Sequence, residues 1–193
     1  MDEVVGRIVD RLDELGLREN TLLLFYGDNG TPRGVQSKMG ERVIDGGKGM
    51  PTDAGTRVPL IANQPGTVVP AVSDDLVDST DFIPTIADVT GMTPPQDRVM
   101  DGVSFAPQLR GERGNAREWV LVHHDPRPGW GKEAYTKLDR WARDKRYKLY
   151  QEGELYDIAE DVLEQNAIPV GEGSADAEAA RGTLQGVLEH FQE

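Results

Sequence analysis

The sequence predicts an α/β chain that ends in a small antiparallel α+β subdomain, and three observations support this fold class. An amphipathic helical pattern is followed by a short loop and an apolar run, the order that is typical of an α/β layer. A long glycine-rich stretch comes next, as in binding loops. In the last third of the chain, short strand patterns alternate with turns. We therefore expect one domain over residues 1–125 and a second over residues 126–193.

The first elements are a helix and a buried strand. Apolar residues recur at helical spacing over residues 2–15, and Gly16 follows as a helix stop. Residues 21–26 are apolar at consecutive positions, which favours a strand buried on both faces of a parallel sheet. Residues 27–57 predict neither a helix nor a strand, and a short strand is expected over residues 58–62.

Three further elements precede the second domain. Residues 78–89 predict a helix with an N-cap near Asp81 and a stop at Gly91. Residues 104–109 predict one or two helical turns, and residues 118–123 predict a strand.

The sequence of the second domain predicts a β-meander and a final helix. The meander spans residues 137–157, with strands around residues 140–143, 147–150 and 154–156. Ser174 is the expected N-cap of the helix. The apolar stripe of this helix consists of Leu184, Val187, Leu188 and Phe191.

Charge and composition exclude several classes of partner. The net charge is -13, so we expect neither a nucleic-acid partner nor an acidic membrane surface. The absence of cysteine excludes disulfides and thiolate metal sites. No apolar run reaches the ~20 residues that span a bilayer, and the first residues show no signal-peptide pattern. An anionic ligand would therefore need a metal, or a well-placed lysine or arginine.

Asp28 and Asn29 follow the apolar run of residues 21–26 after a single glycine, Gly27. Ligands of open α/β sheets bind beyond the carboxyl ends of the strands, and these two side chains carry hard oxygens that suit Ca²⁺ or Mg²⁺. The alternative is an ordinary turn, because Asp-Gly and Asn-Gly sequences favour hairpins. A hairpin needs a second strand straight after the turn, which residues 31–34 do not supply. From the residues alone, both readings stay open.

Lys48 lies in the segment Gly46-Gly47-Lys48-Gly49. Glycines permit close backbone approach to a ligand, and the ammonium supplies a point charge for an anion. A P-loop would need glycine at position 42 and serine or threonine at position 49, so that motif fails. A solvated lysine in a flexible loop remains the alternative.

A histidine and a basic segment are weaker candidates for function. His124, Arg127 and Trp130 would line a substrate pocket if the strand over residues 118–123 ended near the site, but packing roles are the favoured alternative. The basic residues over 132–146 predict a solvated strand face rather than a nucleic-acid patch.

A series of modest motifs follows in order along the chain. The motifs are Gly27-Asp28-Asn29-Gly30, Gly46-Gly47-Lys48-Gly49, Gly55-Thr56-Arg57-Val58-Pro59, Asp78-Ser79-Thr80-Asp81, Asp101-Gly102-Val103-Ser104, Arg146-Tyr147-Lys148-Leu149 and Glu154-Leu155-Tyr156-Asp157. In order and spacing they resemble the C-terminal half of a sulfatase of the alkaline-phosphatase-like superfamily, over about residues 2–170. The resemblance implies an alkaline-phosphatase-like sheet followed by the antiparallel subdomain.

The resemblance also implies roles for individual residues. Asp28 and Asn29 would be ligands of Ca²⁺ (or Mg²⁺), and Lys48 would contact the sulfate group of a sulfated small molecule or glycan. Arg57 matches the arginine of the family's Gly-x-Arg-x-Pro motif, which we interpret as a residue that organises the loop rather than a catalytic one. Relatives usually have Glu-Gly-Gly where this chain has Asp53-Ala54-Gly55. The family resemblance favours an exported enzyme, periplasmic or secreted.

One part of the family's site has no counterpart in this sequence. The sulfatase nucleophile is a formylglycine made within a Cys/Ser-x-Pro-x-Arg motif, which does not occur here. Ca²⁺ also takes about six to eight oxygen ligands, and only two obvious ones are present. We therefore expect a C-terminal fragment that is inactive by itself. A phosphodiester or phosphonate hydrolase of the same superfamily and a non-catalytic binding module remain alternatives.

Overall fold

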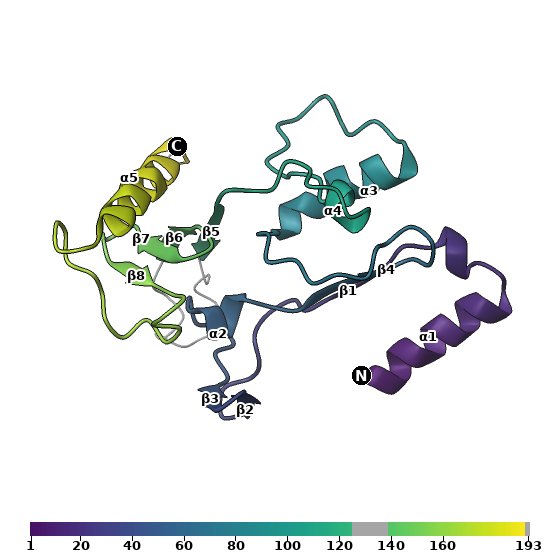
Figure 1. The fold of residues 1–193 in the computed structure, drawn as a ribbon, viewed down its shortest axis with the longest axis horizontal. Helices are drawn as coiled ribbons and strands as arrows, with labels where there is room; N and C mark the ends of the chain where they lie inside the picture. Colours follow the sequence, from purple (N-terminus) through teal and green to yellow (C-terminus); the bar gives the residue numbers. More distant parts are fainter. Residues whose placement is uncertain (125–138, 192–193) are drawn as a thin grey trace, which may run out of the picture. The chain divides into compact units, whose positions relative to one another are not determined.

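The computed structural model describes residues 1–124 and 139–191 (Figure 1). The chain divides into two compact units, which are described in turn. Unit 1 comprises Met1–Gly27 and Pro59–Ala116, and unit 2 comprises Asp28–Val58 and Arg117–Glu193. In the described ranges, every helix is too short or too polar to cross a membrane.

Unit 1 opens with the predicted helix. Its elements are α1 (Asp2–Glu14), η1 (Arg18–Asn20), β1 (Leu23–Tyr26), β4 (Leu60–Asn63), η2 (Ser79–Asp81), α3 (Phe82–Thr90) and α4 (Ala106–Leu109). Helix α1 ends at Glu14, and Gly16 follows it with a φ of 64°, the left-handed conformation expected of a helix stop. The predicted helix over residues 2–15 is therefore confirmed.

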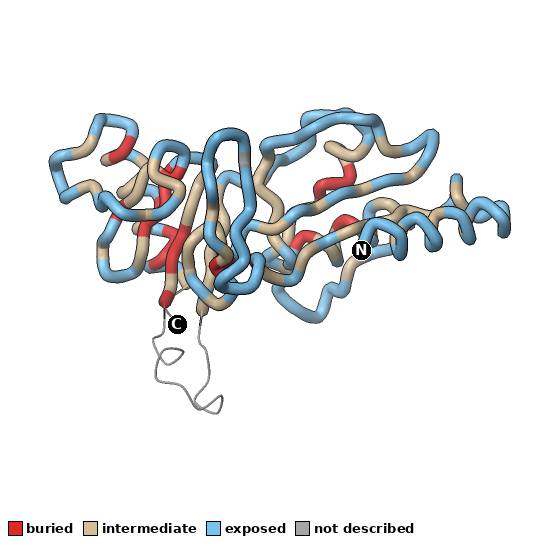
Figure 2. Tube along the Cα trace, turned by 90° about the horizontal axis from the view of Figure 1, so that it is seen from below, coloured by how far each residue is buried: buried red, intermediate tan, exposed pale blue. Residues whose placement is uncertain are grey.

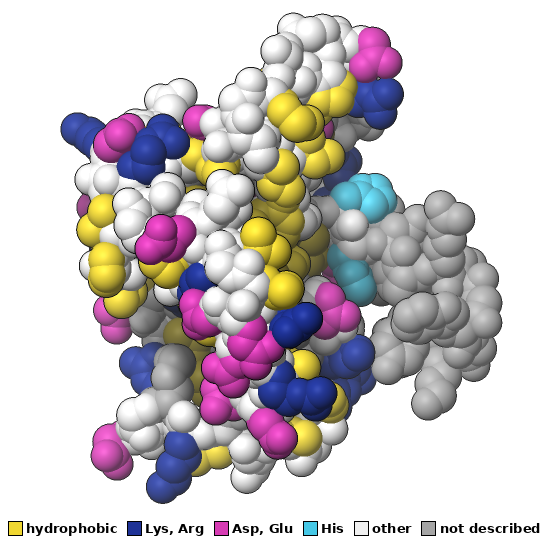
Figure 3. Space-filling model, turned by 90° about the vertical axis from the view of Figure 1, so that its right-hand side faces the viewer, with side chains coloured by type: hydrophobic (Ala, Val, Ile, Leu, Met, Phe, Trp, Pro, Cys, Tyr) yellow, Lys and Arg dark blue, Asp and Glu magenta, His cyan; other side chains and the backbone are white. Residues whose placement is uncertain are grey.

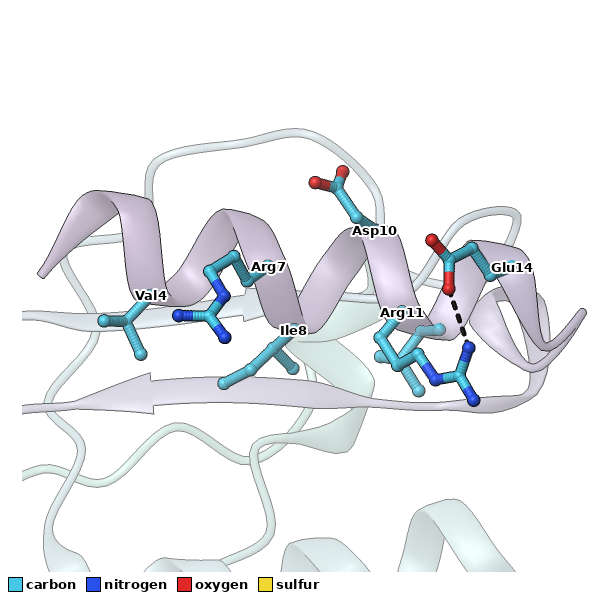
Figure 4. Close-up of a pocket in the computed structure, with 7 residues that line it drawn as sticks. Val4, Arg7, Ile8, Asp10, Arg11 and Glu14 are labelled. Carbon is cyan, nitrogen blue, oxygen red and sulfur yellow. Dashed lines mark hydrogen bonds and ion pairs between the residues drawn. The ribbon is translucent and has the colours of Figure 1, made fainter.

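Helix α1 has apolar residues on two sides. Val5 and Val9 line a hollow together with Phe25 of β1 and Ile61 of β4. A second, shallow hollow runs along α1 itself, where Arg11 pairs with Glu14 at 2.7 Å (Figure 4). Val4 and Ile8 of α1 are 55% and 47% exposed. Figure 3 shows hydrophobic side chains among charged ones on one face of the chain. The apolar stripe of α1 thus covers β1 and β4 only in part.

Strand β1 pairs with β4 in antiparallel register, with Tyr26 opposite Leu60. The expected parallel strand buried on both faces is therefore wrong for the described residues, because the pairing is antiparallel and Tyr26 of β1 is 41% exposed. An apolar run does not specify the direction of its partner strand, since backbone hydrogen bonds form in either direction.

Helix α3 is held by a network of acidic caps. The carboxylate of Asp78 accepts a hydrogen bond from the Thr80 amide at 2.9 Å, and that of Asp81 accepts from the Asp78 amide at 2.8 Å. Asp78 therefore caps η2, and Asp81, which completes the capping box, is the N-cap residue of α3, as predicted. The helix ends at Gly91 as predicted, with φ of 69°.

Unit 2 contains a four-stranded antiparallel sheet in the order β5-β6-β7-β8 and a long helix (Figure 1). Its elements are β2 (Gln36–Met39), β3 (Arg42–Asp45), α2 (Asp53–Thr56), β5 (Val120–His124), β6 (Asp139–Arg143), β7 (Tyr147–Tyr150), β8 (Leu155–Asp157) and α5 (Ala175–His190). The predicted meander is confirmed in β6, β7 and β8, and β5 joins the same sheet. The division of the chain at residue 125 stays a prediction.

The core of unit 2 lies between this sheet and α5. Figure 2 colours the buried residues of the chain red. The side chains of Leu149 and Leu155 from the sheet meet those of Leu184 and Leu188 from α5. The predicted N-cap is confirmed, because the Ser174 hydroxyl accepts a hydrogen bond from the Ala177 amide at 3.2 Å.

The glycine-rich stretch contains structure that the sequence did not predict. Strands β2 and β3 form an antiparallel hairpin that turns at Gly40, and α2 adds one helical turn. Apart from the half-buried Ile44, the described side chains of the hairpin are exposed, so burial imposes no alternation of apolar and polar residues on its strands. Because β2 begins only at Gln36 and pairs with β3, the Asp-Asn-Gly segment at 28–30 is not a hairpin turn.

Candidate functional site

The segment that carries Asp28 and Asn29 follows β1 and packs against α2. The Gly30 amide donates a hydrogen bond to the Gly55 carbonyl at 2.9 Å. A Cβ atom at Gly30 would lie 2.0 Å from the Ala54 carbonyl oxygen. Only glycine therefore allows the two backbones to approach this closely.

The segment that carries Lys48 packs against the same turn of helix. A Cβ at Gly47 would lie 2.8 Å from the Ala54 Cβ, and a Cβ at Gly55 would lie 2.2 Å from the Met50 carbonyl oxygen. We call Gly30, Gly47 and Gly55 the glycine junction. Its glycines let one stretch of backbone approach another. The predicted close approach of a ligand to the glycines around Lys48 stays a prediction.

The glycine junction brings the predicted site residues into one loop cluster. The Lys48 amide donates to the carbonyl of Thr31 at 3.0 Å, and Thr31 lies two residues beyond Asn29. The Arg33 guanidinium donates to the Lys48 carbonyl at 3.2 Å. The backbone of Lys48 is thus tied directly to the segment that follows the two candidate metal ligands.

The side chains of this cluster are open to further partners. The Asn29 amide nitrogen donates to the Gly30 carbonyl at 3.1 Å, which leaves its Oδ1 atom for a cation. Asp28 and Lys48 are exposed, and within residues 1–124 and 139–191 neither the carboxylate nor the ammonium has a hydrogen-bond or ion-pair partner.

The donor chemistry fits part of a divalent-cation site. A carboxylate and an amide oxygen are ligands that Ca²⁺ and Mg²⁺ prefer. In the part of the chain that the structure describes, no three His, Cys, Asp or Glu side chains gather as a metal site. Asp28 and Asn29 would therefore hold a cation only together with ligands from elsewhere.

Arg57 lies at the C-terminal end of α2. Its amide donates to the Asp53 carbonyl at 2.9 Å, and its guanidinium is 3.9 Å from the Asp53 carboxylate. The Arg57 side chain is 75% exposed, so this ion pair contributes little to stability. Its role in organising the loop stays a prediction.

His124 is the last residue of β5 and lies opposite Asp139 of β6. Within the described residues, no hydrogen bond or ion pair joins His124 to Asp28, Asn29 or Lys48. A substrate contact for His124 therefore stays a prediction. The neighbouring candidates Arg127 and Trp130 lie outside the described residues.

Two basic residues next to the site were missed by the sequence reasoning. The Arg143 guanidinium donates to both Asp53 carboxylate oxygens, at 2.9 and 3.1 Å. The Lys148 ammonium donates to the Pro51 carbonyl at 2.6 Å. The predicted solvated face is wrong for Arg143, whose side chain is 14% exposed. The sequence feature that could have indicated these buried contacts is the position of Lys148, a charged residue between the apolar neighbours Tyr147 and Leu149 in a predicted strand.

Two families match the sequence of the chain. The family described as Sulfatase matches residues 1–92. The family described as N-sulphoglucosamine sulphohydrolase, C-terminal, matches residues 47–189. Together the two matches run through the loop cluster and the C-terminal sheet.

Similar proteins include several arylsulfatases and steryl-sulfatases. An arylsulfatase of Hemicentrotus pulcherrimus is 40% identical over 110 residues, which are 56% of this chain and 20% of the relative. A steryl-sulfatase of Mus musculus is 35% identical over 148 residues, 73% of this chain and 23% of the relative. Arylsulfatase A of Homo sapiens is 34% identical over 124 residues, 64% of this chain and 24% of the relative. The chain thus spans less than a quarter of the length of each of these curated relatives.

Solved structures share the fold. One, a protein in complex with its substrate D-glucosamine-2-N,6-O-disulfate, has a TM-score of 0.67 at 24% identity, over 99% of this chain and 38% of that protein. A sulfatase from Pseudoalteromonas sp. has a TM-score of 0.69 at 20% identity, over 99% of this chain and 41% of that protein. These similarities confirm the predicted α/β fold of alkaline-phosphatase-like type with its antiparallel subdomain. The chain belongs to the sulfatase family, of which it represents a C-terminal portion.

Proposed function

We propose that this chain is the C-terminal part of a hydrolase that cleaves sulfate esters. The observation that carries the proposal is the loop cluster, in which the glycine junction ties the segments of Asp28 and Lys48 together while both side chains remain open to partners. Membership of the sulfatase family supports the choice of reaction.

In this proposal Asp28 and Asn29 hold a divalent cation, Ca²⁺ or Mg²⁺. The remaining oxygen ligands come from residues outside the two described ranges, because these two side chains cannot complete a coordination shell of about six oxygens. When bound, the cation supplies Lewis-acid stabilisation of negative charge.

Lys48 binds and orients the sulfate group of the substrate. Its ammonium compensates the negative charge that develops on the transferring group, and its backbone is already fixed by the bond to Thr31. Such preorganised charges need no reorganisation during the reaction, so they are among the largest contributions to catalysis. The acidity of the chain, with a net charge of -13, makes a local cation necessary for any anionic substrate.

The nucleophile is expected in a further part of the polypeptide, N-terminal to this chain. This inference is supported by the absence of a Cys/Ser-x-Pro-x-Arg motif in the 193 residues, and by the 20 to 24% of its relatives' length that the chain spans. The residue is expected to be a formylglycine. The chain itself then contributes metal binding and sulfate binding.

The substrate class that fits this site is a sulfated small molecule or glycan. One protein of the same fold has been solved with D-glucosamine-2-N,6-O-disulfate as its substrate. A phosphodiester or phosphonate hydrolase would use similar oxygen ligands and a similar lysine. Assays with matched aryl sulfate, aryl phosphate diester and aryl phosphonate substrates separate these activities.

The test of the proposed function is Lys48→Ala in the full-length enzyme. We expect kcat for an aryl sulfate to fall by about 10² to 10³, as for other removed stabilisers of transition-state charge. Lys38→Ala is the matched control, because Lys38 is an exposed lysine of the neighbouring hairpin. A kcat within about twofold of wild type for Lys48→Ala would overturn the role of Lys48.

A further inference from the structure

Lys148 is a charged residue in the interior of unit 2. It lies on β7, its side chain is 0% exposed, and its strand neighbours Tyr147 and Leu149 are buried. Burying an ammonium is costly unless it is paired and hydrogen-bonded. The partners that the Lys148 ammonium binds therefore indicate the structural role of this residue.

The Lys148 ammonium is surrounded by acceptors and aromatic rings. It donates to the Glu164 carboxylate at 2.8 Å and to the Pro51 carbonyl at 2.6 Å. The ring centroids of Trp141 and Tyr150 lie 4.6 and 4.8 Å from it. Of these partners, Pro51 alone belongs to the segment that carries Lys48.

Arg143 lies directly opposite Lys148 in the register of β6 and β7. Like charges at opposite positions of a sheet destabilise it unless each has its own partner. Here the guanidinium of Arg143 is paired with the carboxylate of Asp53, and both side chains are largely buried, 14% and 13% exposed. The two cations and the carboxylates of Asp53 and Glu164 have no net charge together.

We call Arg143 and Lys148 the basic clamp. The two residues bind Pro51 and Asp53, which stand on either side of Thr52, the N-cap of α2. The clamp thus fixes the start of α2 through one backbone oxygen and one carboxylate.

The position of Lys48 depends on α2 through the glycine junction. Gly55, within α2, packs against the carbonyls of Gly47 and Met50, which flank Lys48 in sequence. Gly55 also accepts the hydrogen bond from Gly30. A continuous series of contacts therefore runs from the basic clamp through α2 to the Lys48 backbone.

We propose that Arg143 and Lys148 are positioning residues for sulfate binding, which hold the Lys48 segment in place through Pro51 and Asp53. They act through Lys48 and do not touch the substrate. The inference rests on the proposed function of Lys48.

A double-mutant cycle in the full-length enzyme tests this inference. The first change is Lys148→Met together with Glu164→Gln, which removes the contact to Pro51 without leaving a buried charge unpaired. We expect kcat for an aryl sulfate to fall by about 10- to 100-fold, as a small misplacement of a catalytic group does. In the Lys48→Ala background, the same pair of changes is expected to alter kcat by less than about twofold, because no ammonium remains to be positioned.

A second set of variants keeps the test independent of the buried pair. Arg143→Gln is expected to lower kcat by about 10-fold, whereas Arg143→Lys, which retains a cation opposite Asp53, recovers most of the rate. The matched control is Arg146→Gln, because Arg146 directly precedes β7 but pairs with Asp157 of β8 rather than with a residue of α2.

The outcomes distinguish this inference from the proposed function. If Lys48→Ala leaves kcat unchanged, the proposed function fails whatever the clamp variants do. Suppose instead that Lys48→Ala lowers kcat. The positioning role is then overturned if the clamp variants lower kcat equally in the wild-type and the Lys48→Ala backgrounds. It is also overturned if the clamp variants leave kcat unchanged.

Amide hydrogen exchange in the full-length enzyme gives a readout that needs no activity. Loss of the clamp is expected to speed exchange of the Lys48 and Gly55 amides by about 10-fold or more, while the amide of Leu188 in α5 keeps its protection. Unchanged exchange at Lys48 and Gly55 would overturn the inference. Loss of protection at the amides of Lys48, Gly55 and Leu188 together would show that the clamp stabilises the fold in general. That result would also overturn the inference.

Discussion

Gly30 packs against the backbone of Ala54 and Gly55 in α2, and this single residue sets how closely the segment of Asp28 and Asn29 can approach that helix. Its amide bonds to Gly55, and any side chain would collide with the Ala54 carbonyl. The sequence shows a glycine here but not the reason for it. A turn, a ligand and a neighbouring backbone would each favour glycine at this position.

Gly30→Ala is expected to destabilise the chain by about 1 to 3 kcal/mol, because an added methyl in a tightly packed contact forces the backbones apart. The free energy of unfolding in urea measures the effect. Gly182→Ala is the control: it lies in α5 with open space around its Cβ, and should stabilise the chain by about 0.5 to 1 kcal/mol. Equal stability of Gly30→Ala and wild type would contradict the close packing.

Tyr150 and Lys148 show how burial changes the proton affinity of single groups. Burial lowers the pKa of Lys148 below its ordinary value, although the carboxylate of Glu164 opposes that change. Burial also raises the pKa of Tyr150 above its usual range, and the hydrogen bond from its hydroxyl to Glu164 acts in the same direction. Tyr150 therefore remains a neutral donor beside the basic clamp.

Strand β8 ends in an ion pair that makes its stability depend on pH. Asp157 accepts hydrogen bonds from the Arg146 guanidinium at 2.8 and 3.0 Å, and this contact holds the pKa of Asp157 below its ordinary value of 3.8. The folded state therefore binds a proton less readily than the unfolded state. The stabilisation is fully present above about pH 3.8 and is lost as the pH falls through the lower, folded pKa.

Asp157→Asn is expected to reduce the free energy of unfolding at neutral pH, and the difference from wild type should shrink at about pH 3 and below. Urea denaturation of both proteins at the two pH values measures the difference. A gap that stays the same from neutral to acid pH would show that the carboxylate charge contributes nothing.

Helix α5 begins at a side-chain cap that can be tested in the same way. Replacing Ser174 by alanine should cost about 1 kcal/mol, because the Ala177 amide loses its acceptor. Ser174→Asp retains an acceptor and should remain close to wild type in a thermal denaturation. Loss of stability in both variants would point to another role for the hydroxyl.

At the scale of the whole molecule, the 193-residue chain is expected to lack sulfatase turnover by itself. Asp28 and Asn29 are the two cation ligands proposed in it, and its sequence holds no nucleophile motif of the family. Calorimetry should show weak Ca²⁺ binding or none, and a chromogenic aryl sulfate should remain intact. Robust turnover by these residues would refute the proposal that the nucleophile lies elsewhere.

The sequence predicted correctly those helices and strands whose formation depends on their own residues and the adjacent turns. Helix α1, helix α5 and the meander of β6, β7 and β8 were expected because their periodicity and turn residues are local. The hairpin of β2 and β3 was missed because neither face is buried, so burial leaves no periodic pattern. The antiparallel pairing of β1 was missed because strand direction depends on a partner far away in sequence.

For the candidate site as well, some features were determined by the sequence and others only by the tertiary structure. The sequence by itself determined which residue types stand in the loops, Asp28, Asn29 and Lys48, and their family resemblance. Only the tertiary structure decided that the glycine junction packs backbone on backbone, and that Arg143 and Lys148 reach a segment 90 or more residues earlier. The physical reason is that a buried cation must find acceptors, and the folded chain, not the local pattern, decides which segment provides them.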